Sequence, residues 1–338
     1  MISVTACQLR RVVLTLPVAV GGSAHRTSTR EVLEVELRDE AGRFGRGEAA
    51  PLPGYSLDHI EEARRAMELL TLALPRRFAD LGEVETYLSD ATPSARAALE
   101  CALADLLARQ RGLPLWALLR GDADAPSLPL SAVLLGADDT LTAESARLHD
   151  EGYSTLKRKI DARTNLEALA GLGTLRLDAN RSLPPATFLE LTPALLKLGP
   201  ELVEEPIDGD IHEALGSRLP LGADESLAAR TNSEALVALE RLAPSLCAVI
   251  LKPARDGLLG ALRLGRRARA LGLQPIVTHM WDAPTGHLAA LHLALALGDS
   301  TSLAQGLAPQ PTLGDERYSA LMKRGCLLPA QQPGLSDA

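Results

Sequence analysis

The feature that most constrains the fold is a regular alternation of short apolar runs with helical stretches, which begins at about residue 128. Strands separated by helices run parallel in one sheet, because each helix carries the chain back to the same edge. Seven strands and a weak eighth are predicted, at residues 130–135, 154–160, 174–178, 201–205, 219–223, 248–251 and 275–278, and near 302–305. Helices are predicted between them, for example at residues 185–198, 233–242 and 258–271. So many strand–helix units in succession predict a barrel rather than an open sheet.

The first third of the chain has a different pattern, in which strands come before helices. The predicted elements are strands at residues 12–16 and 31–37, a turn through Gly42, Gly45 and Gly47, and amphipathic helices at 59–74 and 94–109. Ser94 is a plausible N-cap of the second helix, and Gly112 a plausible stop after it. This order predicts a small α+β domain.

The two patterns together predict two domains. Gly, Asp and Pro cluster at residues 121–129, so we place the α+β domain at 1–125 and the barrel at 126–308. The tail, about 309–338, is expected to pack back on the first domain.

Charge and hydropathy exclude several classes of function. The net charge of -8 leaves no basic stripe that could neutralise a phosphate backbone, so a small metabolite is a better partner than nucleic acid. The apolar stretch at residues 288–297 is too short to cross a bilayer, and the N-terminus lacks an export signal. We therefore expect a cytoplasmic protein. Its four cysteines are far apart in sequence and are expected to be reduced: Cys7, Cys101, Cys247 and Cys326. The sequence does not predict the oligomeric state.

Charged residues stand at the ends of five successive predicted strands. In a parallel barrel these ends meet at one mouth, where the loops that carry function converge. The five groups are Lys157-Arg158-Lys159, Asp178-Ala179-Asn180, Glu204-Glu205-Pro206, Asp224-Glu225-Ser226 and Lys252-Pro253. Single charges at strand ends often only meet solvent, but five in succession favour a functional site.

The three acids suggest a metal site. Asp178, Glu204 and Asp224 come from neighbouring strands, so their carboxylates can converge on one point. Hard cations such as Mg²⁺, or Mn²⁺ as an alternative, prefer carboxylate oxygens together with water and substrate. No His or Cys stands among these residues, which argues against zinc.

Two lysines flank the acids in sequence, and we expect them to face each other across the metal. Lys159 lies on the strand before the first acid and Lys252 on the strand after the last. Lys157 shares the face of Lys159 by alternation, and a neighbouring ammonium should lower the pKa of Lys159 toward that of a useful base. Such a site suits proton removal next to a carboxylate, because a metal and ammonium groups stabilise the resulting enediolate.

The ordered set KxK, DAN, EEP, DES and KP resembles the muconate-lactonizing branch of the enolase superfamily over essentially the whole chain. The resemblance implies a modified (β/α)7β TIM-like barrel with an N-terminal α+β capping domain. It also implies that Lys159 is the base, that Lys252 is the opposite lysine, and that Asp178, Glu204 and Asp224 hold the metal.

Within that branch, three segments at residues 45–56, 177–181 and 251–253 are similar to o-succinylbenzoate synthases. This similarity implies a lyase that dehydrates 2-succinyl-6-hydroxy-2,4-cyclohexadiene-1-carboxylate on the way to menaquinone. The segment at 278–286 departs from the usual pattern of those synthases, so the substrate is less well defined than the reaction class.

Further residues are expected to surround the substrate. Thr278, His279, Trp281 and Asp282 follow the seventh strand, where substrate is recognised in the superfamily; for His279 and Trp281 a structural role is an equal alternative. Asn180, Arg181 and Glu225 are expected to support the carboxylates. The glycine-rich segment at residues 21–26 is predicted to close over the substrate.

Two other functions stay open. One is an N-acylamino-acid racemase or dipeptide epimerase, in which Lys159 and Lys252 act on opposite faces of one carbon. Dipeptide epimerases usually carry an Asp-x-Asp motif that binds the ammonium of the substrate, and none follows Thr278. The other is a barrel without catalytic activity, which the complete set of charged residues disfavours.

Overall fold

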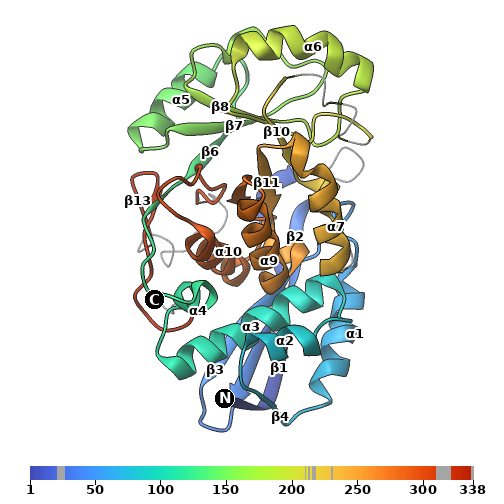
Figure 1. The fold of residues 1–338 in the computed structure, drawn as a ribbon, viewed down its shortest axis with the longest axis vertical. Helices are drawn as coiled ribbons and strands as arrows, with labels where there is room; N and C mark the ends of the chain where they lie inside the picture. Colours follow the sequence, from blue (N-terminus) through green and yellow to red (C-terminus); the bar gives the residue numbers. More distant parts are fainter. Residues whose placement is uncertain are drawn as a thin grey trace.

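The computed structural model describes residues 1–20, 27–209, 211, 214, 218–229, 231–309 and 321–335. The segment at 21–26, predicted to be a lid, lies outside them. Within them, an antiparallel sheet with helices is followed by a parallel sheet whose strands alternate with helices. Figure 1 shows α9 (Leu258–Ala270) and α10 (Pro284–Leu297) between the N-terminal elements and α6 (Pro185–Leu198). No described helix is long and apolar enough to cross a membrane.

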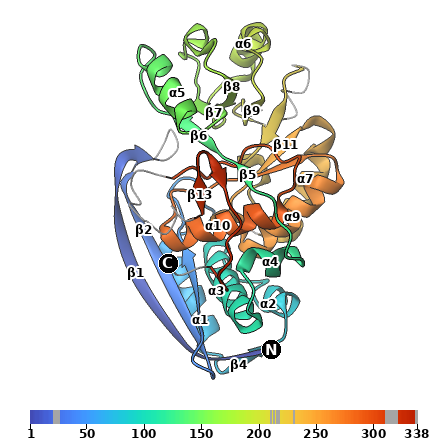
Figure 2. The same ribbon diagram turned by 90° about the vertical axis from the view of Figure 1, so that its left-hand side faces the viewer.

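The N-terminal sheet has the strand order β3-β2-β1-β4. Its strands are β1 (Ile2–Val20), β2 (Thr27–Asp39), β3 (Phe44–Ala49) and β4 (Arg76–Phe78). Leu33, Val35 and Leu37 on β2 are buried, as the alternation of the sequence predicted. β1 and β2 extend beyond the predicted ranges because they pair with each other along most of their length, which produces the long ribbon in Figure 2.

Four helices cover this sheet or follow it, namely α1 (Ile60–Thr71), α2 (Leu81–Tyr87), α3 (Pro93–Arg111) and α4 (Leu115–Arg120). The end of α3 at Gly112 is confirmed, because this glycine has a φ of 68° in the left-handed region. The predicted N-cap was wrong. Thr92 is the N-cap and Pro93 begins the helix, while the backbone N–H and hydroxyl of Ser94 both donate to Asp58.

Two of the three glycines predicted to form a turn lie inside β3 instead. A Cβ atom on Gly45 would lie 2.1 Å from the carbonyl oxygen of Ala102, and one on Gly47 only 1.8 Å from that of Ala98. The strand thus packs directly against the backbone of α3. Only Gly42, with a φ of 78°, belongs to the turn.

The parallel sheet contains seven strands in sequence order, β6 to β12. They are β6 (Ser131–Leu134), β7 (Thr155–Lys159), β8 (Thr174–Asp178), β9 (Leu202–Glu204), β10 (Leu221–Ala223), β11 (Ala248–Leu251) and β12 (Gln274–Val277). In place of an eighth strand, Gln305 bridges to Leu130 beside β6 and Gly306 bridges to Thr278 beside β12. These bridges join the two edges, so the TIM-like barrel is confirmed.

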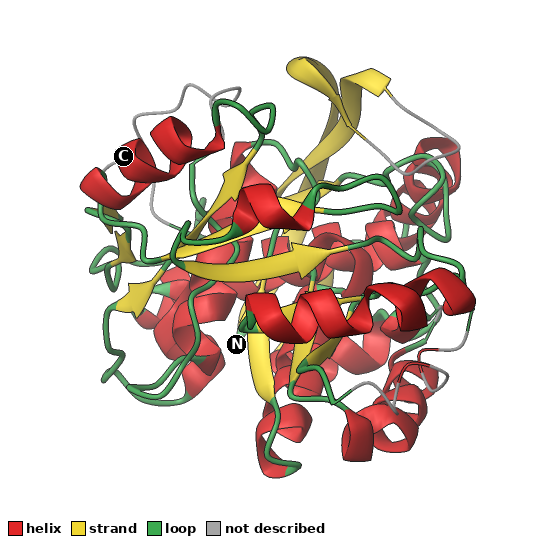
Figure 3. Cartoon of the chain, turned by 90° about the horizontal axis from the view of Figure 1, so that it is seen from above, coloured by secondary structure: helices red, strands yellow, loops and turns green. Residues whose placement is uncertain are grey.

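Helices lie outside the barrel strands, as Figure 3 shows. Besides α6, α9 and α10 they are α5 (Leu141–Asp150), α7 (Asn232–Leu242) and the short α8 (Pro253–Asp256). A proline near the first position starts α6, α8 and α10, where its missing N–H costs no hydrogen bond.

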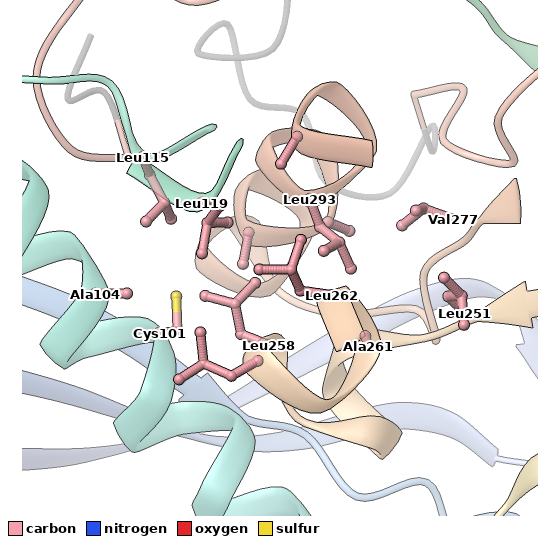
Figure 4. Packing of buried hydrophobic residues seen from close by; sticks show 14 of the residues in the cluster. Cys101, Ala104, Leu115, Leu119, Leu251, Leu258, Ala261, Leu262, Val277 and Leu293 are labelled. Atoms are coloured by element: carbon pink, nitrogen blue, oxygen red, sulfur yellow. The ribbon is translucent and has the colours of Figure 1, made fainter. Parts of the chain in front are cut away.

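One hydrophobic core joins the N-terminal part to half of the barrel. Figure 4 shows Cys101 of α3 and Leu119 of α4 facing Leu258 and Leu262 of α9 and Leu293 of α10. A second cluster fills the other half, between β6–β9 and helices α5 and α6. Among the described residues, the capping domain therefore shares its hydrophobic core with one half of the barrel.

The described part of the tail contacts α3 and α4. β13 (Met322–Lys323) and β14 (Cys326–Leu327) pair with β5 (Leu128–Pro129). The indole N–H of Trp116 donates to the carbonyl of Ala330 at 2.7 Å, and Leu335 N donates to Asp105 at 2.9 Å. The division of the chain at residues 125 and 126 stays a prediction.

Candidate active site

The strand register brings the charged groups to one end of the barrel. Lys159 pairs with Asp178 across β7 and β8, and Asp178 pairs with Glu204 across β8 and β9. Asp224 directly follows β10, and Lys252 directly follows β11. Parallel strands that end together place these side chains around one mouth.

Lys157 lies between the first two acids. Its ammonium is 2.9 Å from Asp178 Oδ2 and 2.5 Å from Glu204 Oε2. Burial alone would lower the pKa of Lys157, but the two carboxylates outweigh it and raise the pKa above its ordinary value. Burial raises the pKa of Glu204, and Lys157 opposes this shift.

Asp224 is held by three groups on its other side. It accepts hydrogen bonds from Lys252 Nζ at 2.5 Å, from Arg255 Nη1 at 2.7 Å and from the Tyr55 hydroxyl at 2.8 Å. Burial would raise the pKa of Asp224, but Lys252 and Arg255 lower it well below its usual range.

The pKa of Lys252 runs opposite to the direction expected for a base. Burial lowers it, but the Asp224 and Glu225 carboxylates outweigh burial, so the pKa of Lys252 is raised. The strong ion pair with Asp224 is the physical reason. Lys159 is exposed and has no ion-pair partner among the described residues.

Asn180, Glu225 and Glu205 surround the acids. Asn180 donates from its backbone to Asp178 Oδ1 and from its side chain to Glu225 Oε1. Burial, together with the Asp224 carboxylate, raises the pKa of Glu225 to about 8. Glu205 accepts from the backbone N–H groups of Asp224 and Ser226, at 2.7 and 2.8 Å, and so fixes the loop that carries Asp224.

The loop after β12 contributes His279 and Trp281 to the mouth. Burial lowers the pKa of His279 well below its ordinary value, with further lowering by the charges of His287, Lys252 and Lys157. His279 Nδ1 accepts from the backbone N–H of Trp281, whose φ of 60° is unusual for an indole residue. Thr278 is buried beneath this loop.

Asp282 belongs to the loop after β12, and the expectation that it contacts substrate stays a prediction. It is fully buried at the boundary with the N-terminal sheet, where the charge of Arg30 acts on it. Its neighbour Glu48 accepts from the N–H groups of Ala283 and Gly286 at the start of α10.

Arg181 was expected to neutralise the acids, but its described hydrogen bond leads elsewhere. Its guanidinium donates to the carbonyl of Gly209 at 2.7 Å. The left-handed backbone of Asn180 and Arg181, with φ values of 43° and 58°, directs the side chain toward that loop.

The sequence reasoning missed Arg255 and Arg30. Arg255 lies three residues after Lys252, which is about one helical turn. This spacing is a signal in the sequence that both side chains can reach Asp224. Arg30 and Tyr55 come from the other domain, and nothing in their local sequence shows what they contact.

The donor chemistry of the mouth fits a divalent cation. Asp178, Glu204 and Asp224 are buried carboxylates on adjacent strands, and each already faces positive charge. Among the residues that the structure describes, no group of three His, Cys, Asp or Glu side chains is arranged to hold one metal ion, and the ammonium groups of Lys157 and Lys252 lie against the acids.

Two protein-family models match the chain. They are described as "Mandelate racemase / muconate lactonizing enzyme, N-terminal domain", over residues 3–120, and "Enolase C-terminal domain-like", over residues 141–337. The chain belongs to the enolase superfamily. The first match covers the N-terminal sheet and its helices, and the second covers most of the barrel.

Several relatives of this enolase superfamily member carry names of isomerases. The chain is 31% identical over 292 residues to an L-Ala-D/L-Glu epimerase of Bacillus subtilis, which covers 79% of this chain and 78% of the relative. It is 32% identical over 317 residues to an N-succinylamino acid racemase of Thermus thermophilus, covering 87% and 83%. A dipeptide epimerase of Methylococcus capsulatus, complexed with Mg and the dipeptide L-Arg-D-Lys, superposes with a TM-score of 0.81 at 26% identity, covering 98% and 99%.

These names correct the assignment to o-succinylbenzoate synthase, and with it the roles in dehydration and menaquinone synthesis. The relatives are dipeptide epimerases and an N-succinylamino acid racemase instead. The prediction failed because the motifs KxK, DAN, EEP, DES and KP encode the removal of a proton. They do not encode what happens to the carbanion afterwards.

Proposed function

We propose that this enzyme is an isomerase that inverts the α-carbon of an N-acylated α-amino acid with a free carboxylate. N-succinylamino acids and dipeptides both belong to this class. The observation that carries the proposal is the placement of two lysines at the ends of β7 and β11, separated by the three strands that lead to the acids.

Lys159 and Lys252 are the proposed acid–base pair. One lysine removes the α-proton from one face of the carbon, and the other delivers a proton to the opposite face. In the reverse direction the roles exchange, so both substrate configurations are used. Lys157 and Lys252 add positive charge beside the substrate carboxylate, where negative charge develops in the enediolate.

Asp178, Glu204 and Asp224 are the proposed ligands of a Mg²⁺ ion. A bound divalent cation supplies charge neutralisation for the enediolate. Glu205 would hold the Asp224 loop, and Asn180 would orient Asp178, so that the ligands are fixed before substrate arrives.

Among N-acylated amino acids, we favour those without a free ammonium group, such as N-succinylamino acids. The sequence has no Asp-x-Asp motif after Thr278 that could bind an ammonium group. His279 and Trp281 lie at the mouth instead, and burial keeps the pKa of His279 low, so its imidazole is neutral and offers no negative charge to an ammonium group. Dipeptides remain the second candidate, because several relatives are dipeptide epimerases.

The test is deuterium exchange at the α-carbon, with Mg²⁺, in ²H₂O. N-succinyl-L- and D-amino acids and a panel of dipeptides would be followed by NMR and by polarimetry. Exchange together with inversion supports the proposal. Absence of exchange in every substrate, with protein shown to be folded, contradicts it.

Variants at the two lysines make this test specific. Lys159→Ala and Lys252→Ala should each reduce inversion by about 10³-fold or more, because removal of a general base affects the transition state. Lys197→Ala, on the outer helix α6, is the matched control and should keep full activity. Full activity in Lys159→Ala would refute the assignment of the base.

A further inference from the structure

Arg30 is a buried arginine whose hydrogen bonds reach two different loops beside the mouth. It lies on β2 and is 1% exposed. Its guanidinium donates to the carbonyls of Ala50 at 2.6 Å and Pro51 at 2.7 Å, and to the carbonyl of Trp281 at 3.3 Å. Arginine suits this position, because its rigid planar fork can serve several acceptors at once.

The first loop leads from Arg30 to Lys252. Residues 52–56 form a closed turn, in which Leu52 accepts from the backbone of Tyr55 and Ser56, and the Ser56 hydroxyl accepts from Leu52 N at 2.9 Å. A turn closed on itself moves as one body, so the two carbonyls held by Arg30 set the place of Tyr55. The Tyr55 hydroxyl accepts from Lys252 Nζ at 2.5 Å.

The second loop leads from Arg30 to the substrate side of the mouth. Trp281 has a positive φ, which an L-residue adopts only when its surroundings hold it there. The bond from Arg30 to the Trp281 carbonyl, and the bond from Trp281 N to His279, are two such supports. Leu52 and Tyr55 of the first loop and Met280 and Trp281 of the second meet in one apolar cluster.

We propose that Arg30 is a positioning residue that sets the distance between Lys252 and the loop at residues 279–281. It acts through Tyr55 on one side and through the Trp281 backbone on the other. The reaction to which this applies rests on the proposed function, whereas the placement of the two loops does not.

The structural half of the test uses tryptophan fluorescence. The chain has two tryptophans, so Trp116→Phe leaves Trp281 as the only reporter. In that background, Arg30→Met should shift the emission of Trp281 to the red and raise its quenching by acrylamide at least about twofold, because the loop loses an anchor. Arg30→Lys retains a charge that can reach one carbonyl and should give an intermediate result.

Arg176→Met is the matched control. Arg176 is equally buried at 1% exposed and donates to a carbonyl, that of Ala304, but it touches neither loop. This variant should lose stability without changing the emission of Trp281. If Arg30→Met and Arg30→Lys behave like Arg176→Met, the proposed role of Arg30 is overturned, whether or not the enzyme is an isomerase.

The kinetic half separates the two lysines. Exchange of the α-proton in ²H₂O is measured from each enantiomer separately, and Lys252→Ala identifies the enantiomer that depends on Lys252. A displacement of about 1 Å at a catalytic group can cost about 100-fold in rate. Arg30→Lys should therefore slow exchange from the enantiomer that depends on Lys252 at least tenfold more than exchange from the other, and raise KM for both.

Equal slowing of both enantiomers would contradict a role through Tyr55 and Lys252. If the wild-type protein exchanges neither enantiomer, the proposed function fails, and the fluorescence comparison alone decides the role of Arg30.

Discussion

The hydroxyl of Tyr55 is the only polar group of the N-terminal part that is described as touching both Lys252 and Asp224. Burial and the Asp224 carboxylate raise the pKa of Tyr55 well above its ordinary value, so this hydroxyl stays protonated and can donate. Tyr55→Phe removes it with little change in shape. We expect kcat to fall about 10-fold to 100-fold with an unchanged melting temperature. Tyr87→Phe, which loses a hydroxyl bonded to the Leu70 carbonyl, is the control and should retain kcat; an equal kcat in both variants would refute the role of Tyr55.

His292 is buried between α10 and α4, and its environment predicts how stability depends on pH. Its Nδ1 accepts from Trp116 N at 3.0 Å, so the imidazole is neutral, and burial lowers its pKa to about 4. A histidine with a lowered pKa contributes stability above its unfolded value near 6.5, and that stability is lost as the pH falls toward 4. This amounts to about 3 kcal/mol for one group.

The measurement is the free energy of unfolding by urea between pH 7 and pH 4. His292→Asn keeps an acceptor for Trp116 N but cannot be protonated, so its stability should fall less in this range than that of the wild type. His59→Asn, at an exposed position, should follow the wild type. Parallel curves for all three proteins would contradict the prediction.

Whether the position of a side chain could be predicted from sequence depended on which contacts fix that side chain. Asp178, Glu204 and Lys252 were located by alternation and strand ends, because a strand fixes the direction of each side chain. The charged neighbours of Asp282 were not predicted, because Arg30 and Glu48 belong to the N-terminal domain and lie far away in sequence. Arg30 could not be found, since its acceptors are backbone carbonyls far away in sequence.

At the scale of elements, the close contact between β3 and α3 predicts that substitution by alanine destabilises the protein much more at Gly47 than at Gly82. Gly47→Ala forces a methyl group to within 1.8 Å of the Ala98 carbonyl oxygen, so the strand and the helix must separate. We expect a loss of about 3 kcal/mol or more. Gly82→Ala, inside α2 with its nearest contact at 3.3 Å, is the control and should be neutral or slightly stabilising. The free energy of unfolding is measured with urea for both variants. Similar losses in the two variants would refute this account of the packing.

Buried glutamates connect the N-terminal elements to the first turns of barrel helices. Glu48 of β3 accepts from N–H groups at the start of α10, and Glu100 of α3 accepts from Leu259 N at the start of α9, at 2.8 Å. Helix N-termini attract negative charge, which partly offsets the cost of burial. Burial still dominates and raises the pKa of Glu100 to about 7.

Glu100 therefore gives a pH dependence opposite in sign to that of His292. An acid whose pKa is raised on folding binds more protons in the native state, so stability falls as the pH rises from about 4.5 to about 7. Glu100→Gln can accept from Leu259 N without ionising and should lack this fall. The difference in unfolding free energy between the two proteins, measured at pH 4.5 and pH 7.5, should change by a few kcal/mol. A difference independent of pH would show that Glu100 ionises freely.

The first and last residues of an element could be predicted where the spacing of apolar residues within that element marks its ends. The strand at 174–178 and the helix at 185–198 were placed correctly, because period-two and period-3.6 patterns are local. The position of the eighth strand was only partly right, since Gln305 and Gly306 make bridges to two different neighbours instead of a continuous ladder. The prediction of a turn at Gly45 and Gly47 was wrong, because these glycines pack against α3, which lies far from β3 in sequence.

Over the whole molecule, the proposed site lies across the boundary between the two hydrophobic cores. Lys157, Asp178 and Glu204 stand on strands of the β6–β9 half, and Asp224 and Lys252 on the half that packs against the N-terminal domain. Figures 1 and 2 both show α5 and α6 at the end remote from α1–α3. In the part of the chain that the structure describes, the β6–β9 half shares no hydrophobic cluster with the N-terminal domain, so it should open at a lower free energy.

A metal ion held by carboxylates from both halves would reduce this difference, because a ligand stabilises only the states that can bind it. We therefore expect amide hydrogen exchange in β7, β8 and α6 to be faster than in α9 and α10 without added metal. Added Mg²⁺ should slow exchange mainly in β7 and β8. Asp178→Asn removes one ligand charge and should abolish the selective effect, whereas Asp138→Asn, at an exposed position after β6, should leave it intact. Uniform slowing over both halves, or no change with Mg²⁺, would mean that the three carboxylates do not share an ion, and that the two halves of the barrel are joined by packing alone.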